Sequence, residues 1–213
     1  MLPATNHRFC AGRARQSGFT LIEALVAAVI LAIGVLGVVS LLTMSKVSQH
    51  EGMDRVRAVA LADDMIERIV RNPGAMDTYD DIGLDAPVGG NTIDEVPDPD
   101  CRIAVCDNPE ELANFDLWAW EQLLDGRATT FDDGGTTTPA VALRNVQGCI
   151  VFTADTGRTN TGIVDVIIQW QGLKETADAV DGGAVCGDAD DEDLTRRQVV
   201  VSTYVIDELE QDL

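Results

Sequence analysis

Residues 18–42 read GFTLIEALVAAVILAIGVLGVVSLL, and this stretch determines how the N-terminal part of the chain folds. No charged side chain occurs between Ala24 and Ser45. A helix of about 20 apolar residues crosses the hydrocarbon core of a bilayer, so the stretch predicts a membrane-spanning helix. Glu23 does not fit that pattern, because a carboxylate at the centre of a membrane helix costs ~2.5 kcal/mol or more. Its presence indicates a second role for the segment.

The helical pattern continues beyond the apolar stretch. From Lys46 to Arg71 apolar residues recur at steps of three and four, which is typical of one face of a helix. Asn72-Pro73-Gly74 ends the pattern, because a residue before proline avoids the α conformation. We therefore expect one helix of roughly 50 residues from Thr20 to Arg71, about 75–80 Å long. The apolar positions of its second half are Val47, Met53, Val56, Val59, Ala60, Met65, Ile66, Ile69 and Val70.

A second, shorter helix is predicted after a loop at 74–107 that is rich in Gly, Pro and Asp. Asn108 suits the N-cap, Pro109 the first turn and Glu111 the third position after the cap, while Gly126 ends the helix. The expected apolar face consists of Leu112, Phe115, Trp118, Ala119 and Leu123. Trp118 and Trp120 allow either core packing or stacking on a ligand, and core packing is favoured because large aromatic side chains usually contribute to cores.

The rest of the chain has the pattern of β-strands separated by turn residues. The candidate strands are 141–145, 149–154, 163–170 and 197–206. Within the third of these, alternate residues are apolar, as in a strand with one buried face. The predicted fold class is therefore α+β: a long N-terminal helix whose C-terminal half packs on an antiparallel sheet of about four strands.

Four of the five cysteines, Cys101, Cys106, Cys149 and Cys186, follow the apolar stretch. An even number of cysteines in an exported segment indicates two disulfides, and three pairings are open. The short separation of Cys101 from Cys106 favours that pair, which leaves Cys149 with Cys186. Zinc binding is the alternative, but the cysteine spacings do not match a zinc ribbon and the chain has only two histidines. We expect no metal site and no cofactor.

The charge is distributed unevenly along the chain. Residues 1–18 carry three arginines and no acid, whereas the remaining residues carry 12 basic and 36 acidic side chains, a net charge of −24. So acidic a chain disfavours nucleic acid as a ligand. The acidic segment 187–194 resembles a calcium-binding loop only loosely, because the glycine and terminal glutamate of an EF-hand are not at their proper spacing. A solvated acidic turn is the preferred interpretation.

The N-terminus differs from an ordinary secretory signal, in which a cleavage site follows the apolar core. Here the helix continues past the core, and the break suited to processing, Ser17-Gly18-Phe19, precedes it. A cut after Gly18 would remove the basic leader and leave the apolar helix as the new N-terminus. It would also place a free amine on Phe19, close to the carboxylate of Glu23.

A basic leader that ends in glycine and precedes FTLIE and an apolar helix resembles the class III signal of type IV pilins and type II secretion pseudopilins. The resemblance implies cleavage by prepilin peptidase between Gly18 and Phe19, N-methylation of Phe19, and a role for Glu23 at the fifth mature position. Over most of the chain less specific segments, including GCIVFTA and VIIQWQG, resemble minor pilins of the PilV type. Ser40 stands where the helix of major pilins usually has proline, which argues against a bulk filament subunit.

The resemblance implies a leader at 1–18, a transmembrane and filament-core helix at 19–44, an amphipathic half at 45–72 and an extracytoplasmic head at 73–213. The implied protein is a minor pilin that helps to initiate or modify the type IV pilus in assembly, motility and adhesion. It would cross the inner membrane once, with its head facing the periplasm, and would reach the cell surface in the fibre. Its expected partners are other minor pilins, the major pilin, prepilin peptidase, the inner membrane and, as a candidate, a tip adhesin.

Within that resemblance Glu23 has a physical explanation. A carboxylate in a dry filament core must be paired, and the Phe19 amine of the same or a neighbouring subunit is the expected partner. Three alternatives remain: a pseudopilin of a type II secretion system, a plain membrane anchor with an accidental glutamate, and an enzyme. An enzyme is disfavoured because no nucleophile motif, phosphate loop or metal-ligand cluster occurs in the sequence.

Overall fold

The computed structural model describes residues 18–139, 143–175, 185–187 and 194–212. The chain divides into two compact units, Met1–Lys46 and Val47–Leu213. We refer to the second unit as the head.

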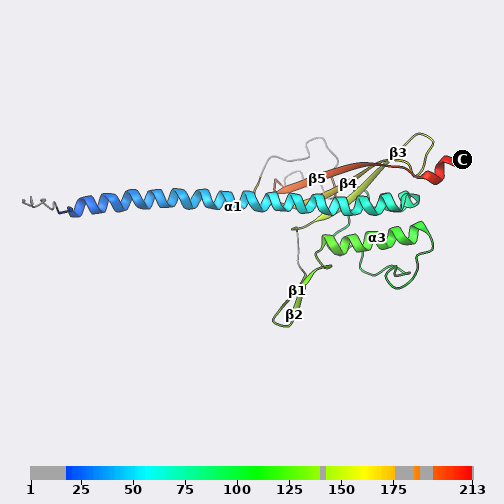
Figure 1. Ribbon diagram of the computed structural model, residues 1–213, viewed down its shortest axis with the longest axis horizontal. Coiled ribbons are helices and arrows are strands. Elements are labelled where there is room, and N and C mark those ends of the chain that lie inside the picture. The colour runs from blue at the N-terminus through cyan, green and yellow to red at the C-terminus, as the bar shows by residue number, and fades with distance from the viewer. Residues whose placement is uncertain (1–17, 140–142, 176–184, 188–193, 213) are drawn as a thin grey trace, which may run out of the picture. The chain divides into compact units, whose positions relative to one another are not determined.

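One helix, α1 (Leu21–Arg71), runs through the boundary between the units (Figure 1). The predicted helix is confirmed to within one residue at its start, and at its end the chain passes through Asn72 into a short 3-10 turn, Pro73–Ala75. In the first unit every described side chain is exposed. α1 is long and apolar enough to cross a membrane. None of the residues in its most apolar part is buried.

Within the head, α1 buries a narrow stripe consisting of Ala58, Ala62, Met65 and Ile69. The expectation that Met53 and Val56 share the core-facing side was wrong, because they are 53% and 70% exposed. The stripe repeats at steps of four, three and four residues, the spacing of one helix face. Two alanines in it let the helix approach the rest of the core closely, which the larger apolar side chains on the neighbouring face would not allow.

The main sheet is antiparallel, with the order β3-β4-β5. Its strands are β3 (Gln147–Ala154), β4 (Gly162–Gln171) and β5 (Arg196–Val205). The apolar face predicted for the central strand is confirmed, since Val164, Val166, Ile168 and Trp170 are all buried, but Ile167 and Gln169 on the other face are buried as well.

The candidate strand at 141–145 is not part of the sheet. Residues 143–145 form a bend and a turn that leads into β3, and 141–142 lie outside the described residues. A separate two-stranded hairpin instead precedes this turn, with β1 (Thr130–Asp133) paired to β2 (Thr136–Pro139). The loop between the strands is the pair Gly134-Gly135, and Gly-Gly is a recognised hairpin signal, but the sequence interpretation did not use it.

The second predicted helix is confirmed as α3 (Pro109–Leu124). The Asn108 side chain accepts a hydrogen bond from the Glu111 backbone N–H at 2.8 Å, which is the predicted cap. After the helix Gly126 has a φ of +70°, a conformation that glycine adopts at little cost.

The predicted apolar face of α3 was wrong. The buried face consists of Ala113, Asp116, Leu117, Trp120, Glu121 and Leu124. Leu112, Phe115, Trp118, Ala119 and Leu123 are instead only partly buried. Trp120 packs in the core and donates its indole N–H to the Leu61 carbonyl at 2.9 Å, whereas Trp118 lies under the Arg102 guanidinium, 4.8 Å from it.

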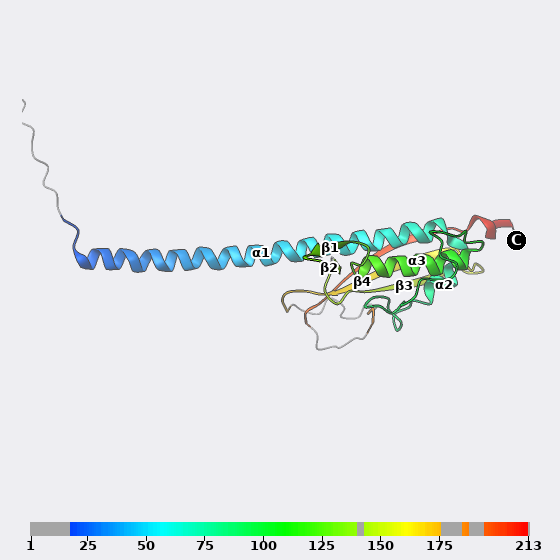
Figure 2. The same ribbon diagram turned by 90° about the horizontal axis from the view of Figure 1, so that it is seen from below.

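Figures 1 and 2 show α3 beside the second half of α1. α3 packs on β3 at Gly148, where a Cβ atom would lie only 2.4 Å from the Trp120 ring. α1 reaches β5, because Glu51 and Arg197 form an ion pair at 3.6 Å. Buried side chains of both helices form one core cluster with Ile150, Val164 and Ile168, so both helices cover the same face of the sheet.

A buried polar network joins the C-terminal end of α1 to the middle of α3. Asp116 on α3 accepts hydrogen bonds from Arg68 on α1 at 3.0 Å and from the Tyr79 hydroxyl on α2 (Met76–Asp80) at 2.9 Å. Burial raises the pKa of Tyr79, and the nearby Asp116 carboxylate raises it further. The phenol therefore stays protonated and remains a donor at neutral pH.

Two disulfides close loops of the head. Cys101 is joined to Cys106 and Cys149 to Cys186, the pairing that the spacing favoured. Cys149 and Cys186 are fully buried on the far side of the sheet, where they pack with Ile167, and the partly buried Leu84 and Val151 contact this cluster.

We predict that the two disulfides stabilise the head unequally. Replacing Cys149 and Cys186 by alanine should lower the free energy of unfolding by about 1–2 kcal/mol more than replacing Cys101 and Cys106, because the former pair closes a loop of 37 residues and the latter one of 5. Denaturant unfolding of the two double variants measures the difference. Non-reducing peptide mapping of the wild type should find none of these four thiols free, and free thiols in exported material would contradict the assignment.

Candidate functional site

The segment around Gly18 and Phe19 lies just before the first helix and has no regular structure. Both residues are exposed, and Phe19 is 78% exposed. Helical hydrogen bonding begins at Thr20, whose carbonyl accepts from the backbone N–H of Glu23 at 3.1 Å and of Ala24 at 3.2 Å. The Gly18–Phe19 peptide bond is therefore exposed and lies outside the helix.

Thr20 also fixes the start of the helix through its side chain. The Glu23 backbone N–H lies 3.4 Å from the Thr20 hydroxyl oxygen, as expected of an N-cap threonine. The carboxylate of Glu23 lies in the first turn, where the positive end of the helix dipole favours an acid. The short spacing from Phe19 to Glu23 therefore places these two residues at the same end of one helix.

The rest of the first unit offers a continuous apolar surface. The side chains of Leu21, Ile22, Leu25, Val29, Ile30, Leu31, Ile33, Leu36 and Leu41 are among those that are between 58% and 80% exposed. Exposed apolar surface on this scale marks an interaction with a membrane or with other proteins. Glu23 is the only acidic residue on the described part of this unit.

The predicted site residues thus fall into separate groups. Gly18, Phe19 and Glu23 lie together at the start of α1, whereas the four paired cysteines lie in the head. Within the described residues no group of three or more metal-binding side chains occurs. The leader residues 1–17 and most of the acidic segment 187–194 lie outside the described residues, so the calcium hypothesis stays untested.

Two buried acids were missed by the sequence interpretation. Glu121 has no exposed surface and accepts hydrogen bonds from the backbone N–H groups of Gly89 at 3.2 Å and Ile93 at 2.9 Å. Asp116 anchors the network with Arg68. Both appear in the sequence as ordinary helix-surface acids, and their partners are distant along the chain, so no local pattern indicates their burial.

Comparison with protein families found one match. A model described as the prokaryotic N-terminal methylation motif matches residues 13–39. Searches of curated proteins and of solved structures found no match. The matched range contains Gly18, Phe19 and Glu23. Together with an α+β fold in which a long N-terminal helix packs on an antiparallel sheet, the match supports a type IV pilin-like protein, a pilin or a pseudopilin, anchored through its apolar helix.

Proposed function

We propose that this chain is a minor pilin, a structural subunit present in few copies that helps to initiate or modify a type IV pilus. The observation that carries the proposal is the arrangement at the start of α1: an exposed, non-helical Gly18–Phe19 bond followed by Glu23 in the first turn of an apolar helix. A motif of this kind favours a structural protein over an enzyme, because processing prepares the helix for packing and not for chemistry.

In this proposal prepilin peptidase cuts between Gly18 and Phe19, and the new amine of Phe19 is methylated. Before assembly the helix at 19–44 crosses the inner membrane and the head faces the periplasm, an oxidising compartment in which disulfides persist. During assembly the helix leaves the lipid for the filament core and exchanges lipid contacts for contacts with the major pilin and other minor pilins. A tip adhesin is a further candidate partner.

The proposal assigns Glu23 an assembly role. In lipid or in a filament core the carboxylate is stabilised only by a nearby positive charge. The amine of Phe19 supplies one, within the same chain or from the adjacent subunit. Pairing between subunits would also favour one axial register, since a shift along the fibre separates the two charges.

We predict that the mature chain begins at Phe19. N-terminal mass spectrometry of protein isolated from its host membrane should find N-methylated Phe19, and a Gly18→Val variant should retain the leader because a branched side chain replaces the glycine at the cut. Wild-type protein that keeps residues 1–18, or that is cut near Ser40, would contradict the proposal.

The alternative is a pseudopilin of a type II secretion system, to which the same methylation motif applies. The two disulfides of the head mildly favour the minor pilin. Deletion of the gene distinguishes the two functions: loss of a minor pilin should reduce surface fibres and leave protein secretion unchanged, whereas loss of a pseudopilin should have the opposite effect.

A further inference from the structure

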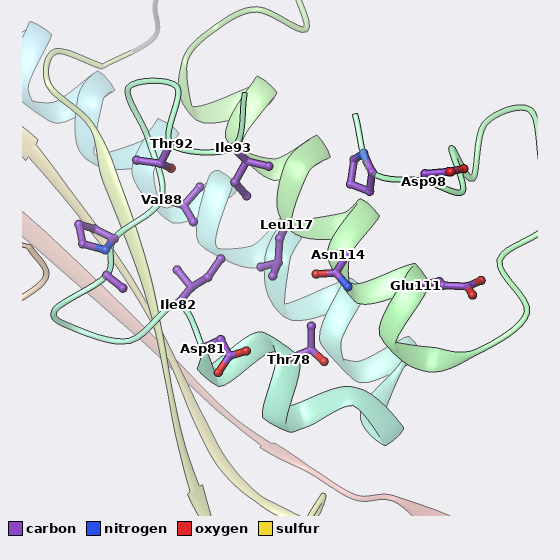
Figure 3. A pocket seen from close by; sticks show the side chains of 13 residues that line it. Thr78, Asp81, Ile82, Val88, Thr92, Ile93, Asp98, Glu111, Asn114 and Leu117 are labelled. Carbon is purple, nitrogen blue, oxygen red and sulfur yellow. The ribbon is translucent and has the colours of Figure 1, made fainter. Parts of the chain in front are cut away.

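A hollow of about 630 Å³ lies in the head between α2, α3 and the loop at 86–98. Its floor is apolar and is built by Ile82, Val88 and Leu117, which are 8%, 3% and 4% exposed, with Ile93 beside them (Figure 3). The volume lies within the ~300–1,000 Å³ range of ligand pockets. The hollow is distinct from the N-terminal site and has no part in the proposed processing.

The walls of the hollow are held by hydrogen bonds and do not need to be ordered by a ligand. Val88 forms a two-bond bridge to Gly148 of β3, with N···O distances of 2.9 and 2.8 Å. The far side of the loop is fixed at Thr92 and Ile93 by the buried Glu121 carboxylate. A pre-organised pocket loses little conformational entropy on binding.

The rim of the hollow is acidic. Asp98 and Glu111 lie on one side and Asp81 on another (Figure 3), and no lysine, arginine or histidine is among the described residues that line it. Glu111 already accepts hydrogen bonds from the Asp107 backbone and the Asn108 side chain. Within the described residues the side-chain carboxylates of Asp81 and Asp98 form neither a hydrogen bond nor an ion pair, so both charges are available to a ligand; the Asp81 backbone N–H donates to the Asp77 carbonyl.

We propose that this hollow binds a lysine or arginine side chain, with an adjacent apolar residue, from a partner polypeptide. An apolar floor with an acidic rim matches the two parts of such a side chain: the methylene stem lies on Ile82 and Leu117, and the cation faces one carboxylate of the rim, that of Asp98 on one side or that of Asp81 on the other. The hollow is larger than one lysine needs, which leaves room for the apolar neighbour. The proposal goes beyond a role in the fibre, because it describes a peptide-binding site on the head.

The test uses the full chain in a neutral detergent, with methyl-labelled isoleucine, valine and leucine. The probe is the peptide acetyl-Ala-Lys-Leu-Arg-Ala-amide, and the comparison peptide replaces both basic residues by glutamate. The basic peptide should shift the methyl signals of Ile82, Val88, Ile93 and Leu117, and raising the salt concentration should weaken its binding because exposed charges are screened. The acidic peptide should leave these signals unchanged.

A charge-matched pair of variants localises the effect. Asp81→Asn with Asp98→Asn should weaken binding of the basic peptide at least about fivefold, equivalent to ~1 kcal/mol. The control, Asp63→Asn with Glu67→Gln, removes the same two charges from exposed positions on α1 outside the hollow and should change binding less than twofold. Equal binding of the acidic peptide, shifts only at other methyl groups, or equal weakening in both variants would overturn the proposal.

Discussion

Glu23→Gln should leave the chain processed and membrane-resident but should reduce its recruitment into fibres by a factor of about one hundred or more. Glutamine keeps the shape of the side chain and lowers the cost of membrane insertion, so the abundance of the monomer should not fall. In the pairing proposed above, the substitution removes the charge that compensates the Phe19 amine. Breaking a buried ion pair in this way typically costs about 3–5 kcal/mol, which corresponds to two or more decades in an association constant.

Co-purification of tagged chain with other pilus subunits measures this effect. Glu67→Gln is the matched control, since Glu67 is an exposed acid on the same helix but lies in the head. It should assemble normally. If the Glu23 variant co-purifies as well as the wild type, the electrostatic role of Glu23 is refuted, whatever the processing result.

Glu121→Ala should destabilise the head by about 3–5 kcal/mol, because it removes an acceptor that several neutral donors share. The carboxylate is fully buried and accepts from Gly89, from the backbone and hydroxyl of Thr92, and from Ile93. Alanine would leave the donors of Gly89, Thr92 and Ile93, which lie at partly buried or exposed residues, without this acceptor, and each donor that water does not reach costs about 1–3 kcal/mol. The loop at 86–98 should then lose its order first.

Chemical denaturation of the full chain in detergent, followed by tryptophan fluorescence, measures the change. Trp120 is a suitable reporter because it lies in the core on the same helix. Glu110→Ala, at an exposed position in the first turn of α3, should change stability by less than about 1 kcal/mol. Equal effects of the two substitutions would show that the Glu121 hydrogen bonds contribute little.

The long helix and its processing motif were predictable because their signals are local. The apolar stretch, Pro73 after Asn72, and the Asn108–Glu111 cap each indicate a boundary from neighbouring residues alone. The three strands of the main sheet were likewise found within two residues of their observed ends, because apolar β-branched runs between turn residues rarely form anything else.

The buried face of α3 was not predictable in the same way. Trp118 and Phe115 give the surface side as strong an apolar pattern as the core side, and the core side carries the two acids Asp116 and Glu121. Asp116 is buried because Arg68, 48 residues earlier, reaches it. Tertiary partners of this kind decide which of two similar helix faces is buried, and the sequence pattern does not contain them.

The hollow beside α3 was not predictable from the sequence for the same reason, because it too depends on tertiary contacts. Its floor joins Ile82, Val88 and Leu117 from three segments, and its rim joins acids that are far apart in the sequence. In the sequence these acids are indistinguishable from the other carboxylates of a chain with a formal net charge of −21. Only the fold shows which of them surround apolar surface.

Mass spectrometry of sheared and purified surface fibres tests the central claim most directly. We expect this chain to be present in the fibres in amounts far below the major pilin, with N-methylated Phe19 as its first residue. A chain that is processed in the membrane but absent from the fibres would contradict its assignment as a minor pilin.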